Sequence, residues 1–339
     1  MKQAPLNFVI SAPRSGSTWL ATALNHHPEI FATEHRLLGE FCELWPNNNG
    51  SFSPRLTFDS YAEAFSVHYF HSFLSLDRNA FVEQFQQSFA QFIVDFALQR
   101  CDKSVVVDKV TPYAGTAELV LEKISRLFPD SKVIELVRDG RDVVTSGTFD
   151  WMLKDGRETD RYEFFMNPKR GKVKMLDRFF DDDVLRKWTE HWLEVAPSLM
   201  ARHQTVSTME TANSPTWTNG ESSDSKVCSM VIRYEQMQAD MPAALRQVFE
   251  FLGVSADKSL CANCAANTTF EKMAGRPAGQ ANPSAKARKG IVGDWQNYFT
   301  RRDGQLFDEL AGQKLVELGY AVDHQWWTRL PEKLGLKYG

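Results

Sequence analysis

Cysteine is scarce in this chain, which has five cysteines among 339 residues. Five is an odd number, so a disulfide framework is not expected. Cys261-Ala-Asn-Cys264 is a C-x-x-C pair without a second pair, which argues against a zinc site. We expect free thiols, with this pair buried or incidental, in a reducing, cytoplasmic compartment.

Long apolar runs and a strong charge imbalance are also missing. No uninterrupted hydrophobic stretch approaches ~20 residues, and no charged-plus-apolar leader precedes the first strand, so we expect neither a membrane span nor export. The formal net charge is −4, which argues against nucleic acid as a partner. Any anionic ligand must therefore be held by local cations. With 43% hydrophobic residues, the chain can form one large domain or a domain plus a subdomain. We expect a single domain over residues 1–339.

The sequence also lacks the Gly-Lys pair of nucleoside-triphosphatase loops, G-x-x-x-x-G-K-[ST], although it contains a related arrangement. An apolar run at 6–10 predicts a buried strand, a small-residue loop follows at 12–16, and a helix is expected over 17–26. A strand, loop and helix start in this order aim unpaired backbone N–H groups at one point, where the helix dipole adds positive potential. The pattern predicts a binding loop for a phosphate or sulfate group.

Several side chains strengthen this predicted loop. Gly16 lets the backbone approach a bound oxyanion closely, which a Cβ would obstruct. Four side chains add hydrogen-bond donors: Arg14, Ser15, Ser17 and Thr18. Trp19 is placed to stack on a purine, although a polar turn followed by a core Trp fits the same spacing.

Apolar runs at 29–32, 104–112, 132–137 and 227–234 predict further strands. A helix is expected between two of them, over 183–203, and further helices after the last strand, over 242–252 and 306–318. Strands that alternate with helices indicate an α/β fold with a central parallel sheet. Ligands of such sheets bind at the carboxyl ends of the strands.

Polar residues follow three of these strands at that edge. Glu34 and His35 are candidate bases, although a solvated charged turn explains the spacing equally well. Lys109 leaves the second strand at the same edge, where a surface lysine is the alternative. Arg138 ends a strand and Ser146 lies about a turn and a half into the next helix, so both can face one bound anion.

Other segments are less informative about chemistry. The aromatic stretch 41–78 fits an acceptor pocket and an ordinary subdomain core equally well. Residues 79–100 predict an amphipathic helix whose phenylalanines, at 3–4 spacing, belong to the core. The charged segment 151–178 is interpreted as a mobile flap, and 205–226, rich in Ser, Thr, Asn and Asp, as a flexible surface loop.

A second basic segment lies near the C-terminus. Arg288-Lys289-Gly290 combines two cations with a flexible glycine and predicts a second compact cationic cradle. A solvated basic loop fits the same residues.

Taken in order, these motifs resemble the sulfotransferases that use 3′-phosphoadenylyl sulfate (PAPS). Arg14-Ser-Gly-Ser-Thr-Trp19 is similar to that family's 5′-phosphosulfate loop, with Arg where cytosolic members usually have Lys. Arg138 and Ser146 match its 3′-phosphate pair, spacing included. The segment 288–295 is similar to its C-terminal phosphate loop, which adds Arg288, Lys289 and Gly290. The likeness implies that Trp19, Tyr234 and Phe270 contact the adenine, with Thr268 nearby.

The chain departs from the cytosolic members at the base. Those members carry a catalytic His two residues after a Lys of the second strand, whereas here Lys109 is followed by Thr111. The front half instead resembles tyrosylprotein and heparan-type members, which use a Glu after the first helix. Glu34 is therefore the implied base and His35 the second choice. The family's dimer motif begins near Trp295, but the sequence departs from it at Thr300-Arg-Arg302. The resemblance therefore does not determine the oligomeric state.

The resemblance implies transfer of a sulfonate group from PAPS to a hydroxyl or amine of a small-molecule acceptor. Adenosine 3′,5′-bisphosphate (3′,5′-ADP, PAP) would be the product, and no metal is implied. Glu34 would take the acceptor's proton, best if burial raised its pKa. Arg14, Lys109 and the loop N–H groups would stabilise the leaving oxygen. A small-molecule kinase of the related P-loop fold and a non-catalytic 3′,5′-ADP-binding module are the alternatives.

Overall fold

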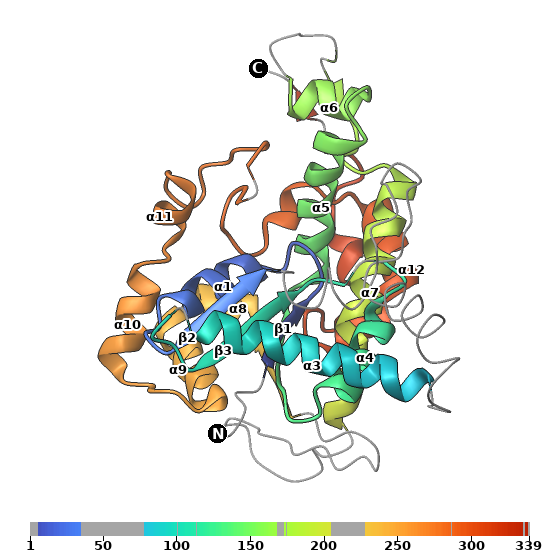
Figure 1. Ribbon diagram of the computed structural model, residues 1–339. Coiled ribbons are helices and arrows are strands. Elements are labelled where there is room, and N and C mark those ends of the chain that lie inside the picture. The colour runs from blue at the N-terminus through green and yellow to red at the C-terminus, as the bar shows by residue number, and fades with distance from the viewer. Residues whose placement is uncertain are drawn as a thin grey trace.

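The computed structural model describes residues 6–34, 78–99, 101–112, 114–167, 173, 175–204, 228–285, 287–334 and 336–337. Its centre is a five-stranded sheet (Figure 1) in which every pairing is parallel. The strand order is β2-β3-β1-β4-β6. The strands are β1 (Leu6–Ser11), β2 (Ile30–Glu34), β3 (Val105–Val110), β4 (Lys132–Val137) and β6 (Cys228–Arg233).

Helices cover both faces of the sheet, which confirms the predicted α/β class. Most connect successive strands, as parallel pairing requires. They are α1 (Ser17–Asn25), α3 (Arg78–Leu98), α4 (Ala117–Leu127), α5 (Gly140–Lys154), α6 (Asp160–Phe165), α7 (Asp182–Gln204), α8 (Tyr234–Ala239), α9 (Met241–Leu252), α10 (Lys258–Ala266), α11 (Phe270–Ala274) and α12 (Arg301–Glu317). Two 3₁₀ turns, η3 (Asp294–Asn297) and η4 (Trp326–Arg329), flank α12. A small antiparallel pair joins β5 (Met175–Leu176) to β7 (Leu336–Lys337).

The sheet separates two hydrophobic cores, and the alternation of β1 shows how. Phe8 and Ile10 belong to the core under α4, α5, α7 and α12, whereas Val9 belongs to the core under α1, α8, α9 and α10. Successive side chains of a strand point to opposite faces, so a strand covered on both faces is largely apolar. All six residues of β1 are buried, and four of them are apolar. The buried Asn7 side chain donates to the Val106 carbonyl and accepts from the Lys132 N–H.

The strand order places a switch of direction beside β1. From β1 the chain crosses to β2 and β3 on one side, and then to β4 and β6 on the other. Crossovers that leave a strand in opposite directions open a crevice at the carboxyl ends of the strands, where α/β proteins bind their ligands. The loop at 12–16 lies at this position, and so do the residues that follow β3 and β4.

Two sequence predictions about helices need correction. Helix α3 forms as expected, but three phenylalanines predicted to belong to the core are exposed: Phe85 is 38% exposed, Phe92 58% and Phe96 45%. Among the described positions of α3, Val94 is the side chain buried in the core. The 3–4 spacing identifies an amphipathic helix, but spacing alone does not determine how much of the apolar face is covered.

The segment 151–178 is predicted as a mobile flap, but its described part includes the end of α5 and the whole of α6. Helix α5 continues to Lys154, and Thr159 caps α6 by accepting a hydrogen bond from the Tyr162 N–H at 3.2 Å. Phe165 packs against Phe149 and Phe179 with ring centroids 5.8 and 5.0 Å apart. A cap and an aromatic cluster order this segment. The predictions for 41–78 and 205–226 concern residues outside the described ranges, apart from Arg78, which begins α3.

No helix within the described ranges combines the length and hydrophobicity that crossing a bilayer requires. Within these ranges Cys228, Cys261 and Cys264 are free thiols, and the last two are buried on α10.

Gly147 in α5 offers a test of the packing between α5 and α7. A Cβ at this position would lie 2.3 Å from the Trp188 ring. Gly→Ala in a helix normally stabilises by ~1 kcal/mol, but overpacking costs about 1–3 kcal/mol. We predict that Gly147→Ala lowers the free energy of unfolding, measured by urea denaturation. In a Trp188→Leu background, Gly147→Ala should leave the free energy of unfolding unchanged or raise it. A higher free energy of unfolding for Gly147→Ala in the wild-type background would contradict the contact.

Candidate active site

The loop between β1 and α1 forms the centre of the site. Gly16 precedes α1 in the left-handed region with φ 93°, and an ideal Cβ there would lie 2.5 Å from the Tyr234 ring. Arg14 is the non-glycine residue with positive φ in the described chain, at 67°. Such a conformation is costly for a side-chain-bearing residue and concentrates at functional sites. The loop therefore requires glycine at 16 and holds Arg14 in a strained position.

Arg14 and Ser146 meet although they are 132 residues apart. The Arg14 Nε donates a hydrogen bond to the Ser146 Oγ at 3.0 Å, and its Nη1 lies 3.8 Å from Asp150. Arg138, at the end of β4, donates from Nη1 to the Arg14 carbonyl at 3.0 Å. Arg138 and Ser146 thus both contact Arg14 of the β1–α1 loop.

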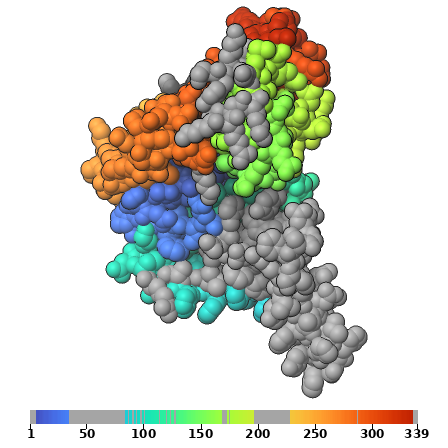
Figure 2. All heavy atoms as spheres, turned by 90° about the horizontal axis from the view of Figure 1, so that it is seen from above, coloured from blue at the N-terminus to red at the C-terminus, as the bar shows by residue number. Residues whose placement is uncertain are grey.

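The C-terminal basic segment joins the same group through Asp142. This buried carboxylate accepts hydrogen bonds from the backbone N–H groups of Gly293 at 2.8 Å and Trp295 at 3.0 Å. It also lies 3.5 Å from Arg138 Nη2, and Arg138 donates to the Ile291 carbonyl at 3.3 Å. The segment 288–295 is therefore fixed against the start of α5. Figure 2 shows the orange C-terminal part of the chain beside the blue N-terminal part.

The cations of that segment are partly neutralised. Asp294 is almost fully buried and accepts from Arg288 Nη2 and from Lys289 Nζ, the latter at 2.7 Å. Burial alone would raise the pKa of Asp294, but the hydrogen bonds from Lys289 and Arg288 hold it below its usual value. The predicted cationic cradle thus contains a carboxylate that holds both cations in place.

Three aromatic side chains line the space between these loops. Trp19 donates from Nε1 to the Thr268 carbonyl at 2.7 Å, and its ring lies 5.8 Å from that of Tyr234. Tyr234 also lies under the Arg138 guanidinium, 4.2 Å from its centre. Phe270 covers Gly290 so closely that a Cβ there would lie 2.2 Å from the ring. Gln238 connects the two groups by donating to the Tyr234 hydroxyl at 2.8 Å and the Gly290 carbonyl at 3.3 Å.

Glu34 and Lys109 form a pair on the other side of the β1–α1 loop. They are adjacent in the β2–β3 register, and Lys109 Nζ lies 3.9 Å from Glu34 Oε2. The Lys109 side chain is 8% exposed and that of Glu34 38% exposed. Lys109 is therefore not the solvated surface lysine of the alternative interpretation. Glu34 is not deeply buried, whereas from the sequence we expect a general base at this position to work best when buried. His35 lies outside the described residues.

The electrostatics of the site are dominated by guanidinium groups held close together. Burial lowers the pKa of Arg14, and repulsion from Arg138 and Arg288 lowers it further, against the attraction of Asp150. Burial also disfavours the charged form of Arg138, yet Tyr234, Asp142 and Glu235 together raise its pKa. Positive charge is thus concentrated at one point, in surroundings that would favour a multiply charged anion. Within the described ranges, no group of three His, Cys, Asp or Glu side chains could hold a metal ion.

A family model described as "Sulfotransferase domain" matches residues 6–319. The chain belongs to the sulfotransferase family. The sequence therefore predicted the family correctly from the β1–α1 loop, the Arg138 and Ser146 pair and the 288–295 segment.

Individual sulfotransferases are similar to the chain at low sequence identity and over part of its length. It is 32% identical to human sulfotransferase 1C2 over 92 residues, which are 24% of this chain and 31% of that protein. It is 23% identical to mouse sulfotransferase 2A1 over 232 residues, which are 63% of this chain and 67% of that protein. The matches thus span about a third to two thirds of these relatives' lengths.

Solved sulfotransferase structures resemble the chain over a greater part of its length. Mouse sulfotransferase SULT7A1 complexed with PAP has a TM-score of 0.48 at 20% identity, covering 94% of this chain and 88% of that one. The sulfotransferase domain of the Synechococcus PCC 7002 olefin synthase has a TM-score of 0.45 at 18% identity, covering 95% of this chain and 96% of that one.

Sequence reasoning missed the residues that hold this sulfotransferase site together. Asp142 and Asp294 are the main ones, with Asp150 and Gln238. Asp142 follows Arg138 by four residues, a spacing at which opposite charges pair on a helix. Asp294 lies inside the recognised 288–295 segment. Both signals were therefore in the sequence, but the backbone groups that Asp142 binds are about 150 residues away.

Asp294 provides a test of the C-terminal segment. Asp294→Asn leaves Arg288 buried without its carboxylate, which should lower the free energy of unfolding by about 3 kcal/mol at pH 7. Because the pKa of Asp294 is lowered on folding, its contribution is complete above pH ~4 and is lost as the pH falls through the folded-state value.

Urea denaturation of both proteins between pH 3 and 7 measures this contribution. Asp177→Asn, which removes a surface pair with Lys333, should cost less than about 1 kcal/mol and is the control. A difference between wild type and Asp294→Asn that stayed constant over this pH range would refute the assigned pairing.

Proposed function

We propose that the chain transfers a sulfonate group from PAPS to a hydroxyl or amine of a small-molecule acceptor, releasing PAP. One observation carries this proposal. Three cationic segments from distant parts of a chain that matches the sulfotransferase domain over 6–319 converge at the carboxyl edge of its sheet. A ligand with two separated anionic groups suits that arrangement better than a single phosphate does.

The β1–α1 loop is suited to the 5′-phosphosulfate end. The backbone N–H groups at the start of α1 have no side-chain cap from Gly16, so they are free to donate to oxyanion oxygens. The buried Ser15 hydroxyl has no hydrogen-bond partner among the described residues. A buried unpaired hydroxyl calls for an explanation, and an oxygen of the donor's phosphosulfate provides one. Ser17 and Thr18 begin the same helix.

Arg138, Ser146 and the segment 288–290 are suited to the 3′-phosphate. The Nε atoms of Arg138 and Arg288 are buried and lack a partner in the described part of the chain. An unpartnered Nε–H of a charged guanidinium can donate a charge-assisted hydrogen bond to a phosphate oxygen. Trp19, Tyr234 and Phe270 then provide apolar faces for the adenine between the two anionic ends. Thr268 positions Trp19 by accepting its indole N–H.

We assign the chemistry at the sulfonyl group to Glu34, Lys109 and Arg14. Glu34 accepts the acceptor's proton as the sulfur–oxygen bond forms, and the bond to the 5′-phosphate oxygen breaks. Lys109 and Arg14 stabilise the negative charge that develops on this leaving oxygen. With 3.9 Å between Lys109 Nζ and Glu34 Oε2, a base and a cation lie within reach of one substrate. His35 is the second candidate base.

The acceptor class and the cellular compartment are further parts of the proposal. The aromatic residues of 41–78 favour a partly apolar acceptor. Free thiols at Cys228, Cys261 and Cys264 support a reducing, cytoplasmic setting.

A transfer assay with ³⁵S-labelled PAPS and a panel of phenols, alcohols and amines tests the function. Label in an organic product supports sulfotransfer. Label from [γ-³²P]ATP in its place would indicate a kinase, and binding of PAP without any transfer would indicate a non-catalytic module. Mass spectrometry of cell extract incubated with PAPS, searching for an added sulfonate, identifies the acceptor.

Glu34→Gln should lower turnover by about 10²-fold or more, because a general base contributes 10²–10⁴-fold. PAP affinity measured by calorimetry should change less than about twofold, since Glu34 lies outside the proposed donor contacts. Glu29→Gln, which changes the carboxylate just before the amino end of β2, is the matched control and should retain full activity. If Glu34→Gln turned over at nearly the wild-type rate, Glu34 would not be the general base, and His35 would be the next candidate.

Arg138→Gln should weaken PAP binding by about 50-fold, whereas binding of adenosine 5′-phosphosulfate, which lacks the 3′-phosphate, should fall only a few fold. Arg138→Lys keeps the positive charge but loses the forked guanidinium, so its affinity for PAP should lie between those of wild type and Arg138→Gln. Thermal melting verifies that each variant is folded. Equal losses for both nucleotides would show that the 3′-phosphate binds elsewhere.

A further inference from the structure

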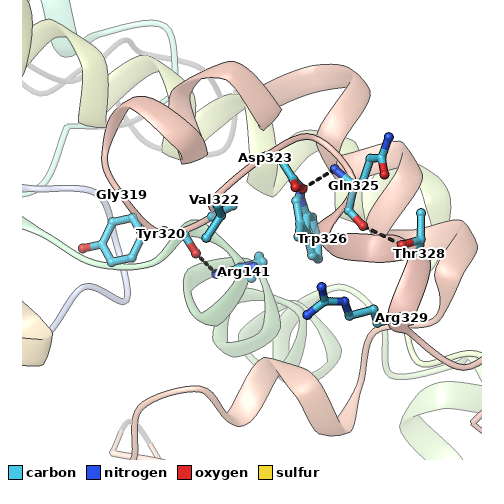
Figure 3. A pocket seen from close by; sticks show the side chains of 10 residues that line it. Arg141, Gly319, Tyr320, Val322, Asp323, Gln325, Trp326, Thr328 and Arg329 are labelled. Atoms are coloured by element: carbon cyan, nitrogen blue, oxygen red, sulfur yellow. Dashed lines mark hydrogen bonds between the residues drawn. The ribbon is translucent and has the colours of Figure 1, made fainter.

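A cavity of about 400 Å³ lies outside the candidate donor site, between the start of α5, the segment after α12, and η4. Figure 3 shows its lining residues, which include Arg141, Tyr320, Val322, Trp326 and Arg329. None of them belongs to the proposed donor or acceptor contacts. The volume falls in the range of small-molecule pockets, so the question is which ligand chemistry the lining favours.

Arg141 is the buried charge in the wall of this cavity. It is 5% exposed, and its guanidinium lies 3.9 Å from the Trp295 ring centre and 4.7 Å from that of Trp326. Its Nε and Nη2 donate to Asp139, and Nη2 also donates to the Tyr320 carbonyl at 2.6 Å. No described residue accepts a hydrogen bond from Nη1. One donor atom of a rigidly held guanidinium is therefore left for a ligand.

Arg329 supplies a second cation to the lining, from η4. It ends η4 and is exposed, and it makes no ion pair or hydrogen bond with the described residues. In Figure 3 its side chain extends toward the cavity, on the side of Arg141. Asp323 is the carboxylate in the lining, and it accepts the Gln325 backbone N–H at 2.8 Å. The lining thus contains two guanidinium groups, of which Arg141 is paired with Asp139, and one carboxylate, Asp323.

We propose that this cavity binds a small aromatic organic acid. Its carboxylate, sulfate or phosphate oxygens would lie between Arg329 and Arg141 Nη1, and its ring would contact Trp326 and Val322. Charge-assisted hydrogen bonds from guanidinium groups favour such oxyanions, and the indole supplies apolar surface.

The ligand would also be coupled to the donor site through shared neighbours. Asp139, which pairs with Arg141, donates its N–H to Glu235 Oε1 at 3.0 Å, and the Tyr320 hydroxyl donates to Glu235 Oε2 at 3.0 Å. Glu235 follows Tyr234 directly. Trp295, which stacks on Arg141, is held by Asp142. A ligand that shifts Arg141 or Tyr320 would therefore shift residues that border the proposed 3′-phosphate contacts.

A titration with 2-naphthoate, followed by ligand-observed NMR, tests the cavity. The full chain is first saturated with PAP so that the donor site is filled. We expect a Kd on the order of 1 mM for a ligand of this size, and at least tenfold weaker binding of the neutral 2-naphthamide. Arg329→Gln should weaken naphthoate binding about tenfold. Arg246→Gln, which changes an exposed arginine on α9, should leave binding unchanged.

Val322→Glu is a second variant that does not depend on Arg329. Val322 is 95% exposed, so the change should not affect folding, and the added carboxylate at the rim should weaken naphthoate binding by several fold. Equal affinity of wild type and both variants, or equal binding of naphthoate and naphthamide, would overturn the proposal. Unchanged PAP affinity with and without naphthoate would overturn the coupling.

Discussion

Repulsion among Arg14, Arg138 and Arg288 is the constraint on which the site depends. Three guanidinium groups lie close enough at the carboxyl edge of the sheet for the charges of Arg138 and Arg288 to lower the pKa of Arg14. Such a cluster is unfavourable in a protein without its ligand unless carboxylates offset it. Asp150, Asp142 and Asp294 each lie beside one of these arginines. These carboxylates partly offset the positive charge, while the buried Nε–H groups of Arg138 and Arg288 have no hydrogen-bond partner among the described residues.

The carboxylates also determine geometry. Asp142 binds two backbone N–H groups of the C-terminal segment as well as Arg138, so it fixes a segment that is distant in sequence at the carboxyl edge of the sheet. Asp294 holds Arg288 and Lys289 together from within that segment. An anion that enters finds donors already oriented, which reduces the entropy lost on binding. The same residues thus contribute to stability and to preorganisation of the site.

Local geometry explains which parts of the site could be predicted from sequence. The β1–α1 loop and the Arg138 and Ser146 pair depend on a strand, a short loop and a helix start, whose relative positions are nearly fixed by backbone geometry. The five-strand order and the role of Asp142 depend on contacts between distant segments, which spacing does not encode. The α3 phenylalanines show a related limit, because periodicity identifies an apolar face but not what covers it. The proposed role of Glu34 depends on its local environment, which the sequence did not reveal: its side chain is 38% exposed and paired with Lys109.

The first turn of α5 belongs to both sites, and this has a physical consequence. Arg138 precedes the helix and faces the Arg14 carbonyl, whereas Arg141 lies three residues later and faces Tyr320 and Trp326. Asp139 lies between them and is the N-cap of α5, with its side chain accepting the Arg141 N–H at 2.9 Å. A cap, an ion pair and a buried backbone contact to Glu235 therefore converge on one residue. Because packed elements of this kind move between discrete arrangements and do not deform continuously, a rotation of this turn that repositioned Arg141 would also reposition Arg138. The donor contacts and the second cavity are thus connected by one short stretch of backbone, without requiring a longer path through the core.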